Sequence, residues 1–368
     1  MSSNPFLRLA GAVAAPWPDE GAVWHYGNPL GEQRALERGD AIVDLSSRGV
    51  IAVPGPDRLS WLNSITSQEL LGLAPGESTE LLVLDPTGRI EWAAKVVDDG
   101  ATAWLIVDRP EVDGLLGFLT KMRFMLRVEP RDATGEYAVI GSSIPLTDWI
   151  AQRSGGDHEI VAEWHDPWSH VTAGGHQYAL GEHPAAQWSW YESIVSPDEQ
   201  QRLAESGAPL AGTAALEALR IAAWRPRAAA EVDERSIPHE LDWLRSAVHL
   251  SKGCYRGQET VAKVHNLGHP PRRLVMLHLD GSDAVLPAHG DPVLLGGDPV
   301  GLITSAAIHH ELGPIALAVV KRSTPTDAVL MVRAEGGDVA AAQEVIVPPG
   351  AGATADVPRL PRLGARTR

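Results

Sequence analysis

The chain has 368 residues, of which 44% are hydrophobic and 21% charged, and it carries a net charge of −16. This composition is typical of a globular protein with two or three domains. The negative charge argues against nucleic acid and anionic membranes as partners, because both attract basic surfaces. One cysteine excludes an internal disulfide and a self-contained four-cysteine metal site.

Residues 1–18 lack a signal-peptide pattern, and no run of about 18 apolar residues predicts a membrane span. With a lone cysteine favouring a reducing compartment, we expect the protein in the cytoplasm. We expect residues 1–20 to form a loosely held N-terminal arm.

Short apolar runs separated by turn residues predict a strand meander followed by a helix between residues 21 and 130. The turn Asp85-Pro86-Thr87-Gly88 predicts a hairpin between two of these strands. This order favours an α+β fold over alternating strand–helix units. The expected helices are 31–38, a segment carrying Leu59, Leu62 and Ile65, and 111–122; the expected strands are 41–45, 50–53, 79–84, 90–97 and 101–107.

Residues 131–187 predict no definite elements, and a strand at 188–195 with helices at 197–206 and 212–224 follows. Residues 225–240 form a long irregular stretch, and loops of this length in compact domains are often functional. A helix at 257–266 is expected to end before Gly268. Such a helix would leave the N–H groups of Gly257, Gln258 and Glu259 free for an anion or a carbonyl.

From residue 272 onward six short strands separated by Gly, Pro and Asp predict a small antiparallel barrel or sandwich. The expected strands are 274–279, 292–295, 300–307, 315–320, 328–332 and 341–347. Residues 348–368 have little to bury, so we expect a disordered tail.

The single cysteine lies in a distinctive run: Lys252-Gly253-Cys254-Tyr255-Arg256-Gly257-Gln258-Glu259. Neighbouring cations and a helix start lower the pKa of a thiol and make it more reactive. A buried structural cysteine in a tight turn is the alternative, since free cysteine is among the most buried residue types. His265 and His269 have a metal-site spacing, but Gly268 ends the helix between them, so we expect no resident metal.

This run resembles the signature of the YgfZ family, folate-binding proteins related to the glycine cleavage T-protein (aminomethyltransferase) that support iron–sulfur enzymes. Residues 298–305 and 313–317 are similar to segments of the T-protein's terminal barrel. The resemblance implies an α+β cloverleaf of three parts around a central funnel for tetrahydrofolate. It implies a folate-binding region of two interleaved α+β parts at 21–270 and a C-terminal antiparallel β-barrel at 271–347.

The chain departs from the T-protein where that family carries paired aspartates, because Trp92 and Ala93 stand at those positions. Glu91 is adjacent but is expected on the opposite face of the strand. Aminomethyl transfer by the usual route therefore looks lost, and whether the protein is an enzyme stays open. A glutamate that meets the pterin in relatives is replaced by Ala222, with Glu217, Glu231 or Asp233 as candidate substitutes.

The resemblance implies a tetrahydrofolate-binding accessory protein that assembles or repairs iron–sulfur clusters in client enzymes, with these enzymes or cluster carrier proteins as its partners. Cys254, with its thiol opening onto the folate cavity, would be its reactive group and a transient iron ligand, and Lys252 would tune the thiol or pair with folate carboxylates. The alternatives are a folate-dependent one-carbon transferase, with Glu91 or Asp99 as poor candidate carboxylates, and a scaffold without a ligand. The expected cofactor contacts are Gly253, Tyr255, Arg256, Gly257, Gln258, Glu259, Arg220 and Arg48.

Overall fold

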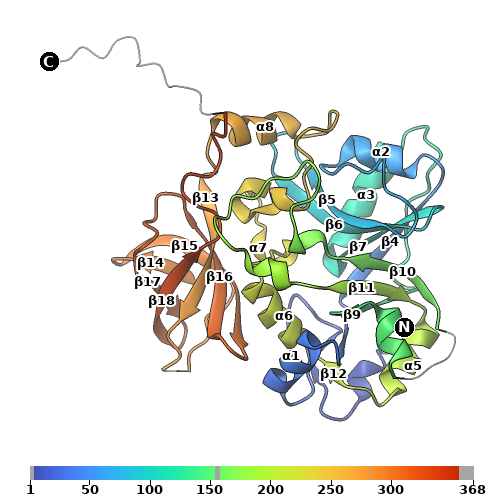
Figure 1. Cartoon of the computed structure of the whole chain (residues 1–368), viewed down its shortest axis with the longest axis horizontal. Coiled ribbons are helices and arrows are strands. Elements are labelled where there is room, and N and C mark those ends of the chain that lie inside the picture. The colour runs from blue at the N-terminus through green and yellow to red at the C-terminus, as the bar shows by residue number, and fades with distance from the viewer. Residues whose placement is uncertain (1–3, 154–157, 283, 356–368) are drawn as a thin grey trace, which may run out of the picture.

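The computed structural model describes residues 4–153, 158–282 and 284–355 (Figure 1). Within these ranges the chain forms two five-stranded sheets with flanking helices and one closed six-stranded barrel. Figure 1 shows the barrel on the left, the two sheets on the right, and helices α6 and α7 between them. No helix in the described ranges is long and apolar enough to cross a bilayer.

The first sheet is antiparallel, with strand order β5-β6-β7-β4-β8, and helices α2 and α3 pack on one of its faces. The turn between β5 and β6 is the predicted hairpin: the Asp85 carboxylate accepts the backbone N–H groups of Thr87 and Arg89, and Gly88 adopts a φ of +81°. The elements are β4 (Arg48–Pro54), α2 (Arg58–Ile65), β5 (Ser78–Leu84), β6 (Ile90–Asp98), β7 (Thr102–Asp108), η2 (Arg109–Glu111), α3 (Val112–Met122) and β8 (Arg131–Asp132).

The second sheet has the order β10-β11-β9-β3-β12 and takes strands from two separate stretches of the chain. Strand β3, which precedes the first sheet in sequence, pairs antiparallel with β9 and parallel with β12. The two sheets therefore use interleaved stretches of the chain. The elements are β3 (Ile42–Asp44), β9 (Ala138–Ser142), α4 (Leu146–Ala151), β10 (Ile160–His165), η3 (Pro167–Ser169), η4 (Pro184–Gln187), β11 (Tyr191–Val195), α5 (Pro197–Glu205), β12 (Leu210–Ala211) and α6 (Thr213–Ala222).

The barrel closes in the order β13-β16-β15-β14-β17-β18 and has its own apolar interior. On its outer surface, Leu274 and Leu317 join an apolar cluster that includes Ile221 of α6, so this side of the barrel is fixed to the rest of the molecule. The strands are β13 (Arg272–Leu279), β14 (Pro292–Leu295), β15 (Asp298–His309), β16 (Gly313–Lys321), β17 (Leu330–Ala334) and β18 (Gly337–Val345).

The long stretch between α6 and the barrel runs through the middle of the molecule. Trp224 and Asp242 adopt positive φ values of 57° and 54° where the chain turns. Most of residues 225–250 are buried, so this stretch is part of the core rather than a surface loop. Its elements are α7 (Ala228–Glu231), η5 (Pro238–Leu241), η6 (Trp243–Arg245) and α8 (Gln258–Leu267).

Both ends of the chain pack more closely than the sequence predicts. The N-terminal segment forms η1 (Phe6–Arg8), β1 (Val13–Ala14) and β2 (Val23–His25), followed by α1 (Pro29–Glu37). Phe6 is fully buried and Asp19 is 2% exposed, so a loosely held arm at 1–20 is wrong for the described residues from 4 onward. In the predicted disordered tail, residues 348–355 pack on α8, where the Thr354 N–H donates to the carbonyl of His265 at 3.0 Å. Residues 356–368 lie outside the described ranges.

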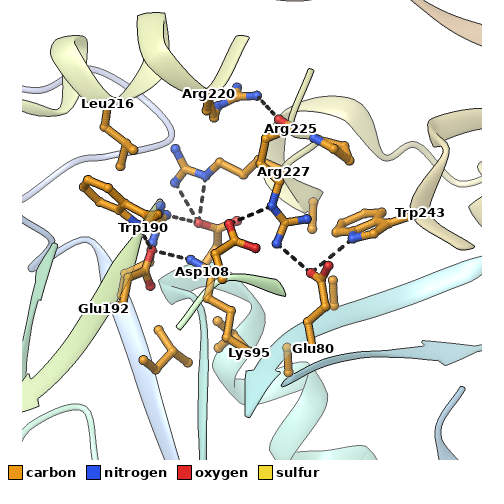
Figure 2. A pocket seen from close by; sticks show the side chains of 18 of the residues that line it. Glu80, Lys95, Asp108, Trp190, Glu192, Leu216, Arg220, Arg225, Arg227 and Trp243 are labelled. Carbon is orange, nitrogen blue, oxygen red and sulfur yellow. Dashed lines mark hydrogen bonds and ion pairs between the residues drawn. The ribbon is translucent and has the colours of Figure 1, made fainter. Parts of the chain in front are cut away.

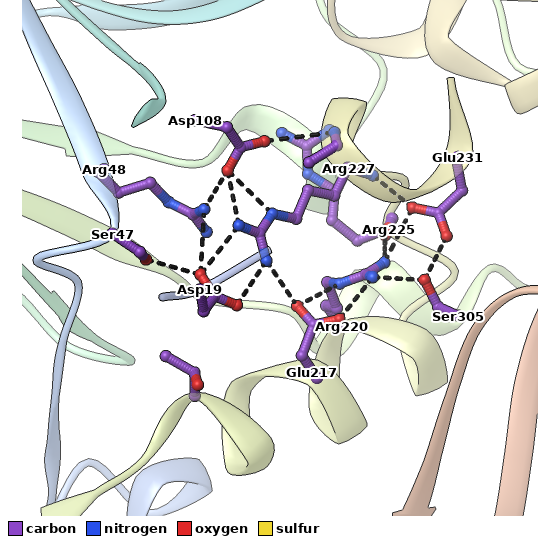
Figure 3. A network of polar contacts seen from close by, with 12 residues as sticks. Asp19, Ser47, Arg48, Asp108, Glu217, Arg220, Arg225, Arg227, Glu231 and Ser305 are labelled. Atoms are coloured by element: carbon purple, nitrogen blue, oxygen red, sulfur yellow. Dashed lines mark hydrogen bonds and ion pairs between the residues drawn. The ribbon is translucent and has the colours of Figure 1, made fainter. Parts of the chain in front are cut away.

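Arg227 lies at the centre of a buried ion cluster (Figure 3). Its guanidinium donates to Asp19 at 2.7 Å and to Asp108 at 2.6 Å, and it lies 3.3 Å from Glu217. Arg48 donates to the same Asp108 and lies 3.6 Å from Asp19. Burial alone would raise the pKa values of Asp19 and Asp108, but the two arginine charges outweigh burial and hold both below their usual range. The cluster therefore joins the N-terminal segment, the first sheet and α6.

Arg220 extends this cluster to the barrel. It donates to Glu217 at 2.6 Å, to Glu231 at 3.1 Å and to Ser305 of β15 at 2.6 Å. A continuous set of ion pairs and hydrogen bonds thus connects the N-terminal segment, the first sheet, α6 and the barrel.

Replacing Arg227 by methionine should lower the free energy of unfolding by about 3–5 kcal/mol, because Asp19, Asp108 and Glu217 would stay buried with too little positive charge. The difference should shrink as the pH falls below about 4, since carboxylates with lowered pKa values stabilise only while ionised. Urea unfolding measures both effects. Arg38→Met is the matched control, because the Arg38–Asp40 pair is exposed and is expected to contribute less than about 1 kcal/mol. Equal losses in the two variants would contradict the role of the cluster.

Candidate functional site

A narrow cavity of about 70 Å³ lies where the two sheets, α6 and the segment after it meet (Figure 2). Charged and tryptophan side chains from both sheets and their connections, from α6 and from the segment after α6 line it. They are Arg48, Glu80, Lys95, Asp108, Asp166, Trp188, Trp190, Glu192, Arg220, Arg225, Arg227 and Trp243.

Each of these carboxylates faces a cation. Glu192 of β11 pairs with Lys95 of β6. Arg225 donates to Glu80 at 2.7 Å and to Asp166 at 3.0 Å. Burial alone would raise the pKa of Glu192, but the charges of Lys95 and Arg48 hold it below its usual value. Burial lowers the pKa of Lys95 by more than the negative charge of Glu192 raises it. This ammonium therefore releases its proton more readily than an exposed lysine.

Two tryptophans form part of the cavity wall and hold two of its carboxylates in place. Trp188 and Trp190 stack with ring centroids 5.9 Å apart and planes at 27°. The indole N–H of Trp188 donates to Asp166 at 2.8 Å, and that of Trp190 donates to Glu192 at 3.2 Å. The cavity therefore combines flat apolar surfaces with fixed charges.

Four buried polar atoms at this cavity have no hydrogen-bond partner among the described residues: Nε of Arg48, Oε1 of Glu80, Oε2 of Glu192 and Nη1 of Arg225. Buried polar groups are nearly always hydrogen-bonded, and exceptions call for an explanation such as water or a ligand. Two donors and two acceptors at one cavity fit a polar ligand that carries both kinds of group. The volume is below the ~300–1,000 Å³ of typical small-molecule sites, so such a ligand requires the ion-paired side chains to move apart.

The structure brings two of the predicted contact residues to this cavity, Arg48 and Arg220. The other predicted carboxylates lie elsewhere. Glu217 and Glu231 bind Arg220, and Asp233 binds Arg272 at 2.6 Å, so none of the three lines the cavity.

On strand β6, Ala93 lines the cavity, whereas Trp92 packs on Phe118 of α3 with centroids 5.5 Å apart. Glu91 pairs with Arg256 outside the cavity, and Asp99 accepts the indole N–H of Trp104 at 2.8 Å. Neither expected catalytic carboxylate reaches the cavity.

Within the signature run, Lys252 is buried and holds the loop in place. Its ammonium donates to the backbone carbonyls of Asn63 at 2.6 Å, Thr66 at 2.9 Å and Gln68. The amide of Gln258 donates to the Lys252 carbonyl at 3.2 Å and closes the loop from its other end. Burial lowers the pKa of Lys252 to about 8. These contacts make Lys252 a structural anchor at the end of α2.

The helix after the signature begins as predicted. Gly257 caps α8 with a φ of +84°, and a Cβ there would lie 2.6 Å from the carbonyl of Asp85, which explains the glycine. The N–H of Gln258 donates to the carbonyl of Tyr255 at 3.2 Å, so it is already engaged. Tyr255 is buried, with the Lys252 ammonium 5.4 Å from its ring centre.

The remaining signature residues face outward. Gly253, Cys254 and Glu259 are exposed, and Arg256 lies over Phe118 at 5.7 Å. Cys254 does not line the central cavity. Among the described residues, no group of three or more His, Cys, Asp and Glu side chains is arranged to hold a metal. A reactive role of Cys254 stays a prediction.

Sequence reasoning missed most of the cavity, although one signal was present. Trp188, Trp190 and Glu192 recur with the period of two that places strand side chains on one face. The contributions of Glu80, Lys95 and Arg225 could not be found this way, because their partners come from distant segments.

Comparison with known proteins shows which proteins this chain is similar to. The family model of the glycine cleavage T-protein C-terminal barrel domain matches residues 272–349. Aminomethyltransferases of Rubrobacter xylanophilus and Rippkaea orientalis are 26% and 28% identical to the chain, covering 84% and 79% of it and 83% and 81% of their own lengths. A putative chloroplastic transferase of Arabidopsis thaliana is 25% identical over 82% of this chain and 70% of its own.

The solved structure of glycine cleavage system aminomethyltransferase T from Bartonella henselae matches 92% of this chain and 94% of its own with a TM-score of 0.70, at 17% identity. The chain thus has the T-protein fold with its terminal barrel, which confirms the predicted α+β architecture. Its similarity in sequence is to GcvT-like aminomethyltransferases, while the narrower YgfZ resemblance stays a prediction.

Lys252→Met should loosen the signature loop, because three backbone carbonyls would lose their donor. Amide hydrogen exchange of residues 250–257 should be faster by about tenfold or more, since a charge-assisted hydrogen bond contributes about 1.5–3 kcal/mol. Lys263→Met, at an exposed position of α8, is the control and should leave exchange unchanged. Unchanged exchange in Lys252→Met would argue against the anchoring role.

Proposed function

We propose that the protein binds a reduced folate in the central cavity and acts as a folate-dependent one-carbon transferase. The observation that carries the proposal is the set of unpartnered donors and acceptors that line this cavity on a T-protein fold. The similarity to aminomethyltransferases over about four fifths of the chain supports it and is consistent with a reduced folate as cofactor.

The residues present fit a pterin in their chemistry. Glu80 and Glu192 offer acceptors to its ring N–H groups, Arg48 and Arg225 offer donors to its carbonyl and ring nitrogens, and Trp188 offers a flat surface. When bound, the folate supplies nitrogens that accept a one-carbon unit. Entry requires the side chains that narrow the cavity to separate.

The chain's own proton-exchanging group at this place is the Lys95–Glu192 pair. It lies on the cavity wall two residues beyond Ala93, one of the two positions where the resemblance places the relatives' aspartates. Burial lowers the pKa of the Lys95 ammonium, so this group releases a proton more readily than an exposed lysine, as a proton-exchanging group must. The pair therefore offers a route that does not need the missing carboxylates.

Tetrahydrofolate should quench the tryptophan fluorescence of the purified protein, and Glu192→Gln should weaken binding by about 10–100-fold, the equivalent of one charged hydrogen bond. Glu91→Gln is the matched control, because Glu91 lies outside the cavity. Ala93→Leu, which fills the cavity without changing its charge, should also weaken binding and covers the case in which Glu192→Gln fails to fold. Absence of binding by the wild-type protein would sink the proposal.

Transfer itself is tested with tetrahydrofolate and an aminomethyl or N-methyl donor. Methylene-tetrahydrofolate and ammonia should form from the aminomethyl donor, or methyl-tetrahydrofolate and the demethylated amine from the N-methyl donor, above background with wild type and not with Lys95→Met. Folate binding without any product from either class of donor would leave a folate-binding protein and reject the transferase.

The iron–sulfur accessory function expected from the YgfZ resemblance is a second candidate, favoured by the exposure of Cys254 between Gly253 and Tyr255. An exposed thiol is open to a client enzyme or a cluster carrier, as that function requires. Cys254→Ser should fold normally, since the side chain is exposed, yet fail to restore cluster-dependent enzymes in a deletion strain. Full rescue by this variant would reject the role of the thiol.

A further inference from the structure

The end of helix α3 carries a cluster of exposed apolar side chains, which we call the α3 tip and define as residues 122–126. Phe124 and Met125 are 85% and 84% exposed, and Met122 and Leu126 are each 41% exposed. Scattered exposed apolar residues are ordinary, but a contiguous group indicates an interaction surface. Phe124 also adopts a φ of +47°, which holds the chain in a conformation rare for a large side chain.

A groove of about 380 Å³ runs along α3 as far as Lys121, the residue that precedes the α3 tip. It is lined along α3 by Asp113, Gly114, Gly117, Phe118 and Lys121, and from the other side by Glu91, Trp92 and Arg256. A Cβ added at Gly117 would meet nothing within 4 Å, so this face of the helix is open. An apolar projection and a groove with aromatic walls therefore lie side by side on one element.

The charged side chains of α3 differ in sign between the two ends of the helix. Asp113 stands in the first turn, Lys121 in the last turn, and Arg123 follows the helix. These three side chains are exposed and form no ion pair with another described residue. The tip is thus basic and apolar, whereas the opposite end of the same groove is acidic.

We propose that this face of α3 is the contact between two copies of the chain, related by a two-fold axis with their α3 helices antiparallel. In this arrangement the tip of one copy lies in the groove of the other, and Arg123 of each copy faces Asp113 of its mate. A two-fold contact requires a self-complementary surface, and an adjacent projection and groove with opposite charges at their ends provide one. A parallel arrangement would place like charges together. The proposal does not depend on folate binding.

Sedimentation velocity of the full chain between about 1 and 100 µM tests this contact. Wild type should show a dimer that grows with concentration, and the double variant Phe124→Ser/Met125→Ser should raise the dimer dissociation constant at least tenfold. Leu180→Ser is the control, because Leu180 is 79% exposed but lies outside the face. A wild-type chain that stays monomeric at 100 µM, or a dimer that the double variant leaves intact, would overturn the proposal.

A charge exchange tests the two-fold geometry. Asp113→Lys and Arg123→Glu should each weaken the dimer, because each places like charges together at both ends of the contact. An equimolar mixture of the two variants should restore association, since in the mixed dimer the two introduced charges have opposite signs and face each other, while Arg123 and Asp113 form the native pair at the other end. A mixture that associates no better than either variant alone would contradict the antiparallel arrangement. Unchanged folate binding in these variants keeps this test separate from that of the proposed function.

Discussion

The structure depends on the pairing of buried charges around Arg227. Four carboxylates and three arginines from the N-terminal segment, the first sheet, α6 and the segment through α7 approach one another in the interior, where an unpaired ion is costly. Their charges are matched when the N-terminal segment, the first sheet and α6 adopt the arrangement seen here. The central cavity lies beside this cluster, between the two sheets, α6 and the segment after α6.

The central cavity is also lined by buried ion pairs, but some of its polar atoms have no hydrogen-bond partner. Arg225 and Glu192 each have a partner and also retain an unpartnered polar atom, in surroundings where such atoms are rare. A low-dielectric wall with fixed charges favours a ligand that offers complementary groups and disfavours an apolar one. The stacked tryptophans add a surface for a flat ring, so the same place can select both shape and polarity.

Much of the fold could be predicted from the sequence, because periodicity and turn residues are local properties. The hairpin at Asp85 and the six barrel strands are examples. The buried N-terminal segment could not be predicted, since the burial of Asp19 depends on Arg227, which lies 208 positions away. Only part of the site could be predicted, because its residues come from segments that are distant in the sequence. A resemblance indicated Arg48 and Arg220, whereas Lys95 and Glu80 acquire a role only through partners on other elements. Motif reasoning placed Cys254 in a turn and expected its thiol to open onto the folate cavity, whereas the structure places Cys254 on the surface and outside the central cavity.

The proposed function requires the cavity between the two sheets to hold a pterin. A crystal structure of the protein with tetrahydrofolate would locate the ligand. We expect a pterin ring against Trp188 or Trp190, with its N–H groups on the free oxygen of Glu192 and the Lys95 side chain displaced. A folate bound elsewhere, or a Lys95–Glu192 pair unchanged at saturating folate, would contradict it.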